Sequence, residues 1–413
     1  MNQYAFTVTE RFLRYVQIDT QSNPDSTENP STGKQLVLSE LLAKELQQMG
    51  ASQVHTDAFG YVYAKIPATV QHAVPTVAFC SHIDTAPDCS GTNVKPLVHR
   101  NYNGDTINLP LENQSISPQK YPYLLQHIGG TIITASGDTL LGADDKAGVA
   151  IIMDFAHYLL THPHLPHGEV SIVFTPDEEV GRGTEKIDLN RVGASYAYTL
   201  DGGEAGSFED ETFSANMATL TIHGIIAHPG QGKGNLVNAI KLVAEVLELL
   251  PKKELTPETT EGREGFIHPT HIGGLAEAAT VSFLLRDFDT KALATYKEMI
   301  EKAAQTVTNL YPGTSYTLTV QEQYRNMREI IDLHPQIVNF AKTAYQKLQL
   351  PFIHTPIRGG TDGSKLSWMG LPTANLFTGM QAIHSRHEWV AVKDMELSVQ
   401  MLVQLIQEWA AAN

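Results

Sequence analysis

Apolar positions follow a helical period and a strand-like period in turn along the first half of the chain. Residues 36–50 carry apolar side chains at helical spacing and end at Gly50, a common C-terminal stop for a helix. Apolar runs at 60–66, 76–84 and 169–176 read as strands, and a second helix is expected from about 146 to 160. This alternation predicts an α/β fold in which helices cover a largely parallel sheet.

The pattern changes in the middle of the chain. From about Phe213 the sequence predicts, in order, a strand, a helix, two strands, a helix and a strand, at 217–225, 236–250, 266–274, 278–288, 292–311 and 315–324. This β-α-β-β-α-β order is the split βαβ sandwich, a compact unit that can be inserted into another domain. Since the α/β pattern resumes after about Met327, we expect a discontinuous catalytic domain at 1–212 and 322–413, interrupted by an inserted domain at 213–321.

Length agrees with two domains, because the chain has 413 residues and single cores stop growing at roughly 250 to 300. One stretch stands apart from the strand and helix signals. Residues 88–126 are rich in Pro and Asn and are expected to form a long surface excursion.

Charge and cysteine content exclude several classes of partner. The formal net charge is -16 with no basic stripe, so nucleic acid and anionic membranes are not expected partners. The only two cysteines, Cys80 and Cys89, imply no disulfide framework, and a reducing compartment, the cytoplasm, is expected. The first twenty residues lack a basic start followed by an apolar stretch, so neither a signal peptide nor a spanning helix is expected.

Candidate chemistry comes from five ligand-type side chains that each follow an apolar run: His82, Asp144, Glu179, Asp201 and His384. The carboxyl ends of parallel strands lie along one edge of a sheet, where α/β proteins bind ligands. Two imidazoles and three carboxylates gathered there would suit zinc, and one bridging carboxylate would allow two ions. Cobalt and manganese fit the same donors.

The first two motifs each have a plainer explanation. His82 and Asp84 could be a structural pair, or Asp84 could accept a hydrogen bond from the imidazole NH and fix the tautomer of a metal ligand. Asp144 and Asp145 precede a helix, where an acid is a common N-cap and the positive end of the helix dipole favours anions.

The later motifs are also ambiguous when each is taken alone. Asp177, Glu178 and Glu179 could form a solvated acidic turn, or one acid could bind metal while its neighbour stays free as a base. Asp201 lies beside glycines and could be an ordinary turn aspartate.

The histidines outside the strand-like runs need the same caution. His384 and His387 share one tail segment, and in isolation either reads as a partly exposed structural histidine. The histidines of HPHLPH, at 162–167, lie in a Pro-containing connection that is expected to be a surface loop.

Taken together and in order, the motifs resemble a known family. The chain resembles peptidase T, a family of tripeptide aminopeptidases, in RFLRYVQIDTQS, HIDT, LLGADDKAG, FTPDEEVG, LDGG, TIHGIIAHPG, RGGTDGS and a late histidine. That family is part of the superfamily of two-zinc exopeptidases that also includes carboxypeptidase G and succinyl-diaminopimelate desuccinylase. The resemblance covers essentially the whole chain, and its strength lies in the joint order and spacing of the motifs.

The resemblance implies a metal-binding role for each of the five ligand-type residues. His82 and Asp201 would hold one zinc, Glu179 and His384 would hold the other, and Asp144 would bridge both, with a cis peptide bond after it. Asp144 is preferred to Asp145 because relatives with a single acid in this motif keep the first position.

The resemblance also implies how the reaction would proceed. Asp84 would orient His82, and Glu178 would be the general base for a metal-activated water, with a pKa above the ordinary ~4.3 of glutamate. The inserted domain would be a lid and dimerisation domain, and its His228 would steady the developing oxyanion in a partner subunit of a homodimer. Arg286 and Arg358 would be clamps for the carboxylate of a small peptide, although either could form a structural ion pair.

The leading functional hypothesis is a zinc-dependent aminopeptidase that releases the N-terminal residue from tripeptides. A dipeptidase, a carboxypeptidase or an N-acyl-amino-acid deacylase on the same dinuclear site is the alternative. A catalytically silent metal-binding or scaffold protein is a third hypothesis, and the spare acid Glu178 speaks against it.

Overall fold

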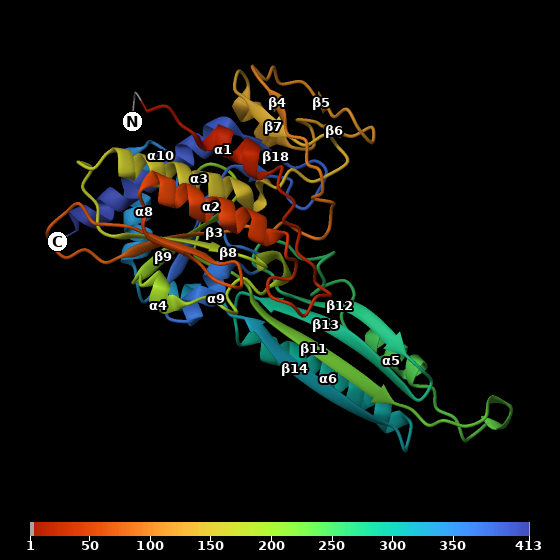
Figure 1. Cartoon of the computed structure of the whole chain (residues 1–413). Coiled ribbons are helices and arrows are strands. Elements are labelled where there is room, and N and C mark those ends of the chain that lie inside the picture. Colours follow the sequence, from red (N-terminus) through yellow and green to blue (C-terminus); the bar gives the residue numbers. More distant parts are fainter. Residues whose placement is uncertain (1–3, 413) are drawn as a thin grey trace. The chain divides into compact units, whose positions relative to one another are not determined.

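The computed structural model describes residues 4–412, which separate into two compact units. Unit 1 consists of residues up to Asp210, Glu329–Thr355 and the chain from Thr361, and unit 2 consists of Glu211–Arg328 and Pro356–Gly360 (Figure 1). The inserted domain expected at 213–321 lies within unit 2, which also takes in the end of the last strand and a short returning segment. No helix among residues 4–412 is long and apolar enough to cross a membrane.

Unit 1 is built on an eight-stranded sheet with the order β1-β2-β8-β3-β9-β16-β10-β15. The central strands β8, β3, β9 and β16 run parallel, and antiparallel pairings flank them. This arrangement confirms the α/β class and the largely parallel core. The strands are β1 (Ser52–Thr56), β2 (Val62–Ile66), β3 (Val77–His82), β8 (Val170–Thr175), β9 (Tyr196–Gly202), β10 (Ser207–Glu209), β15 (Ile353–His354) and β16 (Thr373–Phe377).

Helices cover both faces of this sheet, with α2 and α3 above it and α4 and α9 below it in Figure 1. The expected helix at 36–50 is α2, and Gly50 ends it with φ +93°, a conformation that glycine adopts without a Cβ clash. The helices are α1 (Val8–Tyr15), α2 (Gln35–Met49), α3 (Ala143–Thr161), α4 (Leu189–Val192), α7 (Arg328–Ile331), α8 (Gln336–Lys347), α9 (Asp362–Trp368) and α10 (Val392–Ala411).

The expected surface excursion at 88–126 is more ordered than its composition suggests. Its side chains Tyr102, Ile116 and Leu124 are buried in a small apolar cluster with Trp389. A second four-stranded sheet, ordered β17-β18-β7-β4, joins this region to the C-terminal segment. The elements here are β4 (Leu97–His99), β5 (Ile107–Asn108), β6 (Ser115–Ile116), η1 (Pro122–His127), β7 (Ile132–Thr134), β17 (Met380–Gln381) and β18 (Trp389–Ala391).

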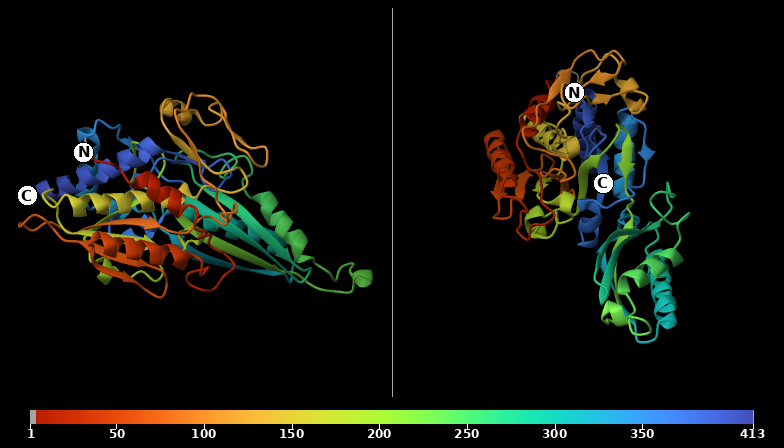
Figure 2. Two further views of the ribbon diagram at one scale, coloured as in Figure 1. Left: turned by 45° about the horizontal axis from the view of Figure 1, so that its top comes forward. Right: turned by 90° about the vertical axis from the view of Figure 1, so that its right-hand side faces the viewer.

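Unit 2 has the β-α-β-β-α-β order that the sequence predicts. Its antiparallel sheet has the order β12-β13-β11-β14, and α5 and α6 lie on one face of it (Figure 2). Alternate residues such as Leu220, Ile222, Val281 and Phe283 are fully buried against these helices, as a half-covered sheet requires. The elements are β11 (Ser214–His223), η3 (Pro229–Gln231), α5 (Ala239–Leu249), β12 (Phe266–Gly274), β13 (Ala278–Asp287), α6 (Ala292–Leu310) and β14 (Ser315–Tyr324).

Candidate metal centre

The five ligand-type residues reach one place in unit 1 by two different routes. His82 is the last residue of β3, Asp201 lies near the end of β9, and Glu179 lies in the turn η2 (Glu178–Val180) just after β8. Asp144 instead is the second residue of the kinked helix α3, and His384 lies in the loop between β17 and β18 with φ +57°. The expectation that all five follow strands of one sheet is therefore wrong for Asp144 and His384.

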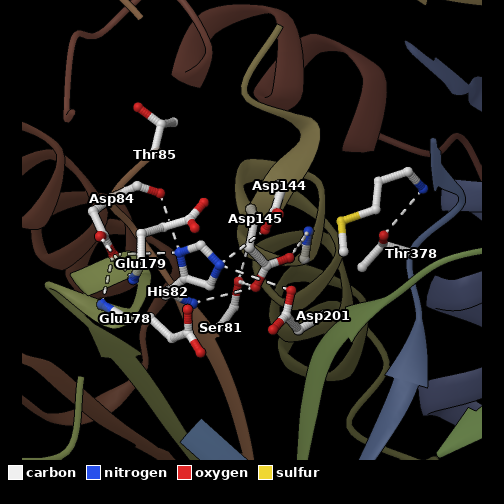
Figure 3. Close-up of polar contacts among 12 residues, drawn as sticks. Ser81, His82, Asp84, Thr85, Asp144, Asp145, Glu178, Glu179, Asp201 and Thr378 are labelled. Atoms are coloured by element: carbon white, nitrogen blue, oxygen red, sulfur yellow. Dashed lines mark hydrogen bonds and ion pairs between the residues drawn. The ribbon is translucent and has the colours of Figure 1, made fainter. Parts of the chain in front are cut away.

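The side chains nevertheless converge, and Asp144 lies between the two imidazoles. Its Oδ1 is 3.0 Å from His82 Nε2 and its Oδ2 is 3.1 Å from His384 Nε2. Glu179 Oε2 is 3.0 Å from His384 Nε2, and Asp201 Oδ1 is 3.8 Å from His82 Nε2. Figure 3 shows His82, Asp144 and Asp201 pointing toward one another.

The donor set fits divalent cations. The ligand atoms of His82, Asp144 and Glu179 lie within 4.8 Å of one another, as do those of His82, Asp145 and Asp201. Glu179 Oε1 is a buried carboxylate oxygen with no hydrogen-bond partner among the described residues, which is costly unless a cation faces it. Imidazole nitrogen and carboxylate oxygen are donors that zinc accepts.

Electrostatics support the same interpretation. Burial and the nearby Asp144 raise the pKa of Glu179 to about 8, and the same two causes raise the pKa of Asp201 to about 6. Burial also acts on Asp144, but the imidazoles of His384 and His82 hold its pKa well below the usual range. Crowded buried carboxylates of this kind repel one another unless positive charge lies among them.

Asp84 links one of the predicted ligands to the predicted base. Its fully buried carboxylate accepts hydrogen bonds from the backbone N–H groups of Glu178 at 3.0 Å and Glu179 at 3.2 Å. His82 Nδ1 lies 3.1 Å from the backbone carbonyl oxygen of Asp84 and 3.3 Å from its Oδ1. Burial raises the pKa of Glu178 well above its ordinary value, which is the direction expected for it.

Asp144 and Asp145 are adjacent but have different surroundings. The peptide bond between them is cis, as the family resemblance implies. The carboxylate of Asp145 is held by the Ser81 hydroxyl and accepts from the backbone N–H groups of His82 and Gly148, each at 3.2 Å. Those bonds occupy both oxygens of Asp145, whereas the oxygens of Asp144 face the two imidazoles.

The remaining histidines have ordinary partners. His387 Nε2 lies 2.9 Å from the side-chain oxygen of Gln114. His162 is exposed and stacks on Tyr158, as a surface loop predicts, whereas His167 is buried, with Nδ1 2.7 Å from the carbonyl oxygen of Gly168. The surface-loop prediction is therefore wrong for His167.

Two polar side chains at the site escaped the sequence reasoning. Glu388 is buried and accepts backbone hydrogen bonds from the segment that carries Asp144, and Asn375 Oδ1 accepts from the backbone N–H of Asp201 at 2.9 Å. An acid next to the apolar run Trp389–Ala391 was the available signal for Glu388. Asn375 lies inside an apolar strand, and a polar residue there was the corresponding signal.

The predicted substrate residues all lie in unit 2. His228 is exposed, and its Nδ1 accepts a hydrogen bond from the backbone N–H of Gly230 at 3.2 Å. Arg286 donates to the carbonyl oxygen of Asn216 at 3.2 Å and to Gln323 Oε1 at 2.8 Å, and it lies over the ring of Tyr324.

Arg358 is tied to a loop of its own unit. Its guanidinium donates to the carbonyl oxygens of Gly262 at 3.0 Å and Glu264 at 2.8 Å. It also lies 5.1 Å from the ring centroid of Phe213. These contacts tie Arg358 to the segment 260–264 of unit 2.

Comparison with known proteins gives one consistent family. Residues 138–408 match the model of the peptidase family M20/M25/M40. Proteins called peptidase T from Desulfitobacterium hafniense and Bacillus velezensis are each 45% identical to the chain. The first covers 98% of both chains, and the second covers 96% of this chain and 97% of its own length.

Solved structures agree at the level of the fold. The aminopeptidase PepT of Bacillus cereus gives a TM-score of 0.74, and a tripeptidase of Staphylococcus aureus gives 0.75. Each is 22% identical and covers 98% of both chains.

Proposed function

This chain belongs to the peptidase family M20/M25/M40 and is a metallopeptidase, and we propose that it releases the N-terminal residue from tripeptides. The observation that carries this proposal is the 45% identity, over 98% of both chains, with a protein named peptidase T. The convergence of His82, Asp144, Glu179, Asp201 and His384 in unit 1 supports a metal-dependent reaction.

We assign two zinc ions to this site. His82 and Asp201 would hold one ion, Glu179 and His384 the other, and Asp144 would bridge them. The contacts of Asp144 support the bridging role, because each of its oxygens faces a different imidazole. Cobalt or manganese would fit the same nitrogen and oxygen donors.

Glu178 is the general base in this proposal. Two bound zinc ions would supply a lowered pKa of the attacking water and polarisation of the peptide carbonyl. The carboxylate of Glu178 accepts the proton of that water and delivers it to the departing amine. Asp84 fixes the position of Glu178 through its backbone N–H and orients the imidazole of His82 from Nδ1.

The substrate contacts in unit 2 stay predictions. His228 would steady the developing oxyanion of a partner subunit, and Arg286 or Arg358 would bind the peptide carboxylate. Either arginine would have to exchange its present carbonyl or amide acceptors for that carboxylate. A role of His228 in trans would require a homodimer, which the molar mass in solution would reveal. The cytoplasm stays the compartment predicted from the cysteine content.

A panel of related peptides tests the activity. Purified zinc-loaded protein would be given a tripeptide, its N-acetylated form, its C-terminal amide, and the matching dipeptide and tetrapeptide. An aminopeptidase for tripeptides should release the first residue of the free tripeptide and fail on the acetylated form. Preferred cleavage of the acetylated form would support a deacylase, and preferred cleavage of the dipeptide would support a dipeptidase. Release of the C-terminal residue would support a carboxypeptidase.

A further inference from the structure

We propose that Glu388 is the positioning residue for the bridging carboxylate Asp144, an inference that rests on the proposed metal-dependent function. Glu388 would act through the backbone of Asp144, without contacting substrate. Its loss would weaken the binding of both metal ions, because Asp144 would serve both.

Both oxygens of the Glu388 carboxylate accept backbone hydrogen bonds from the segment at the start of α3. Oε2 accepts the backbone N–H groups of Leu141 at 2.7 Å and Gly142 at 2.8 Å, and Oε1 accepts the backbone N–H of Asp144 itself at 2.9 Å. Glu388 is only 1% exposed, so water does not compete for these bonds. Hydrogen bonds are stronger in the low dielectric of a protein interior than in water, so three of them fix the geometry of this segment tightly.

The segment 141–144, which donates these hydrogen bonds, has an unusual backbone conformation. Gly142 adopts φ +81°, a backbone conformation that residues with a Cβ rarely adopt. Asp144 and Asp145 have non-helical backbone angles although they lie within the span of α3. Three N–H groups that the helix cannot satisfy therefore meet a single acceptor on another segment.

The same loop holds Asp144 at two points. His384 Nε2 lies 3.1 Å from Asp144 Oδ2, and Glu388, four residues further on, holds the backbone of Asp144. Trp389 follows directly and pairs with Thr134 between β18 and β7, so the small sheet anchors this loop. Both oxygens of Asp144 depend on its backbone position, and a shift there would misplace them toward both imidazoles.

The test compares Glu388→Gln with a matched control. The control is Asp154→Asn, because Asp154 is also a buried carboxylate that accepts two backbone N–H groups, those of Thr7 and Val8, each at 3.0 Å. Asp154 lies in α3 too, but it holds the N-terminal segment and not the loop before Asp144. Both substitutions replace an acceptor oxygen by an NH₂ donor that faces backbone donors.

Three measurements report on the metal site: zinc affinity by chelator competition, bound zinc per chain, and the absorption spectrum of the cobalt-loaded protein. Thermal unfolding of the metal-free proteins reports on stability. We expect Glu388→Gln to weaken zinc binding roughly 10 to 100-fold and to change the cobalt spectrum. Asp154→Asn should lower the unfolding temperature while zinc affinity stays near wild type. Wild-type zinc affinity in folded Glu388→Gln, or an equal loss in the control, would overturn the proposal.

A second variant covers the case in which Glu388→Gln does not fold. Glu388→Asp keeps the charge but withdraws it by one methylene, so zinc affinity should fall by a smaller factor, with kcat falling more than KM rises. Unchanged zinc affinity in Glu388→Asp would also overturn the proposal. Because zinc binding is measured without peptide, wild-type protein that binds zinc yet cleaves no tripeptide would contradict the proposed activity and leave the Glu388 comparison intact.

Discussion

The two units of the chain differ in what they bury. Unit 2 buries an apolar layer between its sheet and the helices α5 and α6. Unit 1 buries, besides its apolar core, a set of acids whose pKa values are raised chiefly by burial: Glu178, Glu179, Asp201, Glu209, Asp362, Glu388 and Asp394. Burying a carboxyl group disfavours its charged form, so unit 1 carries an electrostatic cost that the apolar layer of unit 2 avoids.

This difference separates the residues that serve chemistry from those that serve folding. Unit 1 contains acids that repel one another, and a cation, a backbone N–H group or a bound proton can offset their negative charge. The apolar layer of unit 2 has no such requirement, and its alternating strands explain its shape without reference to a reaction. Substitutions of the buried acids at the proposed metal site should therefore act on catalysis, and substitutions in the apolar layer of unit 2 should act on stability.

The largest effect is expected for substitution of Glu178, the proposed general base in unit 1. Glu178→Gln should lower kcat for tripeptide cleavage by roughly 10²- to 10⁴-fold, because the variant cannot accept a proton. Bound zinc per chain should stay at the wild-type value, since Glu178 is not among the proposed ligands. Steady-state kinetics and metal analysis check the two parts, and wild-type turnover by the variant would rule out Glu178 as the base.

A core substitution in unit 2 tests whether the two units depend on each other. Phe283→Ala should lower the free energy of unfolding of unit 2 by about 3 to 5 kcal/mol, because a fully buried aromatic side chain is replaced by a cavity. All three tryptophans, Trp368, Trp389 and Trp409, lie in unit 1, so tryptophan fluorescence reports on that unit alone.

Urea unfolding of Phe283→Ala should be followed by fluorescence and by far-ultraviolet circular dichroism together. If the units unfold separately, circular dichroism should show an earlier transition while the fluorescence transition stays at the wild-type urea concentration. If both signals shifted together, the two units would unfold as one cooperative unit, and the separation of stability from catalysis between them would be wrong.

The smallest expected effect concerns a buried acid away from the metal centre. Asp394 accepts a hydrogen bond from the Tyr123 hydroxyl at 3.0 Å and lies 3.3 Å from His127 Nε2. Burial raises the pKa of Asp394 to about 7, and burial lowers the pKa of His127 to about 4. His127 therefore stays neutral in the folded protein between pH 5 and 8.

A raised carboxyl pKa means that the folded state favours the protonated form. The stability that Asp394 contributes is present below its ordinary pKa of about 4 and is lost as pH rises through about 7. Asp394→Asn stays neutral, so its stability relative to wild type should grow by on the order of 2 kcal/mol between pH 5 and pH 8. Urea unfolding followed by tryptophan fluorescence at both pH values measures this difference, and an equal difference at both would contradict the prediction.

Local patterns were enough to predict the secondary structure of unit 2. The alternation of Leu220 and Ile222 in β11, and of Val281 and Phe283 in β13, is the period of a half-covered strand, so each element could be read from its own residues. The small sheet of unit 1 was not predicted, because its strands show no such local pattern. Its strands are two or three residues long, too short for a period, and β4 and β18 pair with the same strand β7 from distant parts of the chain.

By itself, the sequence determined the α/β class, the inserted β-α-β-β-α-β unit and the residue types of the proposed metal site, because periodicity and side-chain chemistry are local properties. Only the tertiary structure decided how the donors meet: Asp144 enters from a helix start and His384 from a loop, and the buried Glu388 holds that helix start in place. These contacts join residues more than two hundred positions apart. Their geometry depends on the folding of everything between them, which no local pattern encodes.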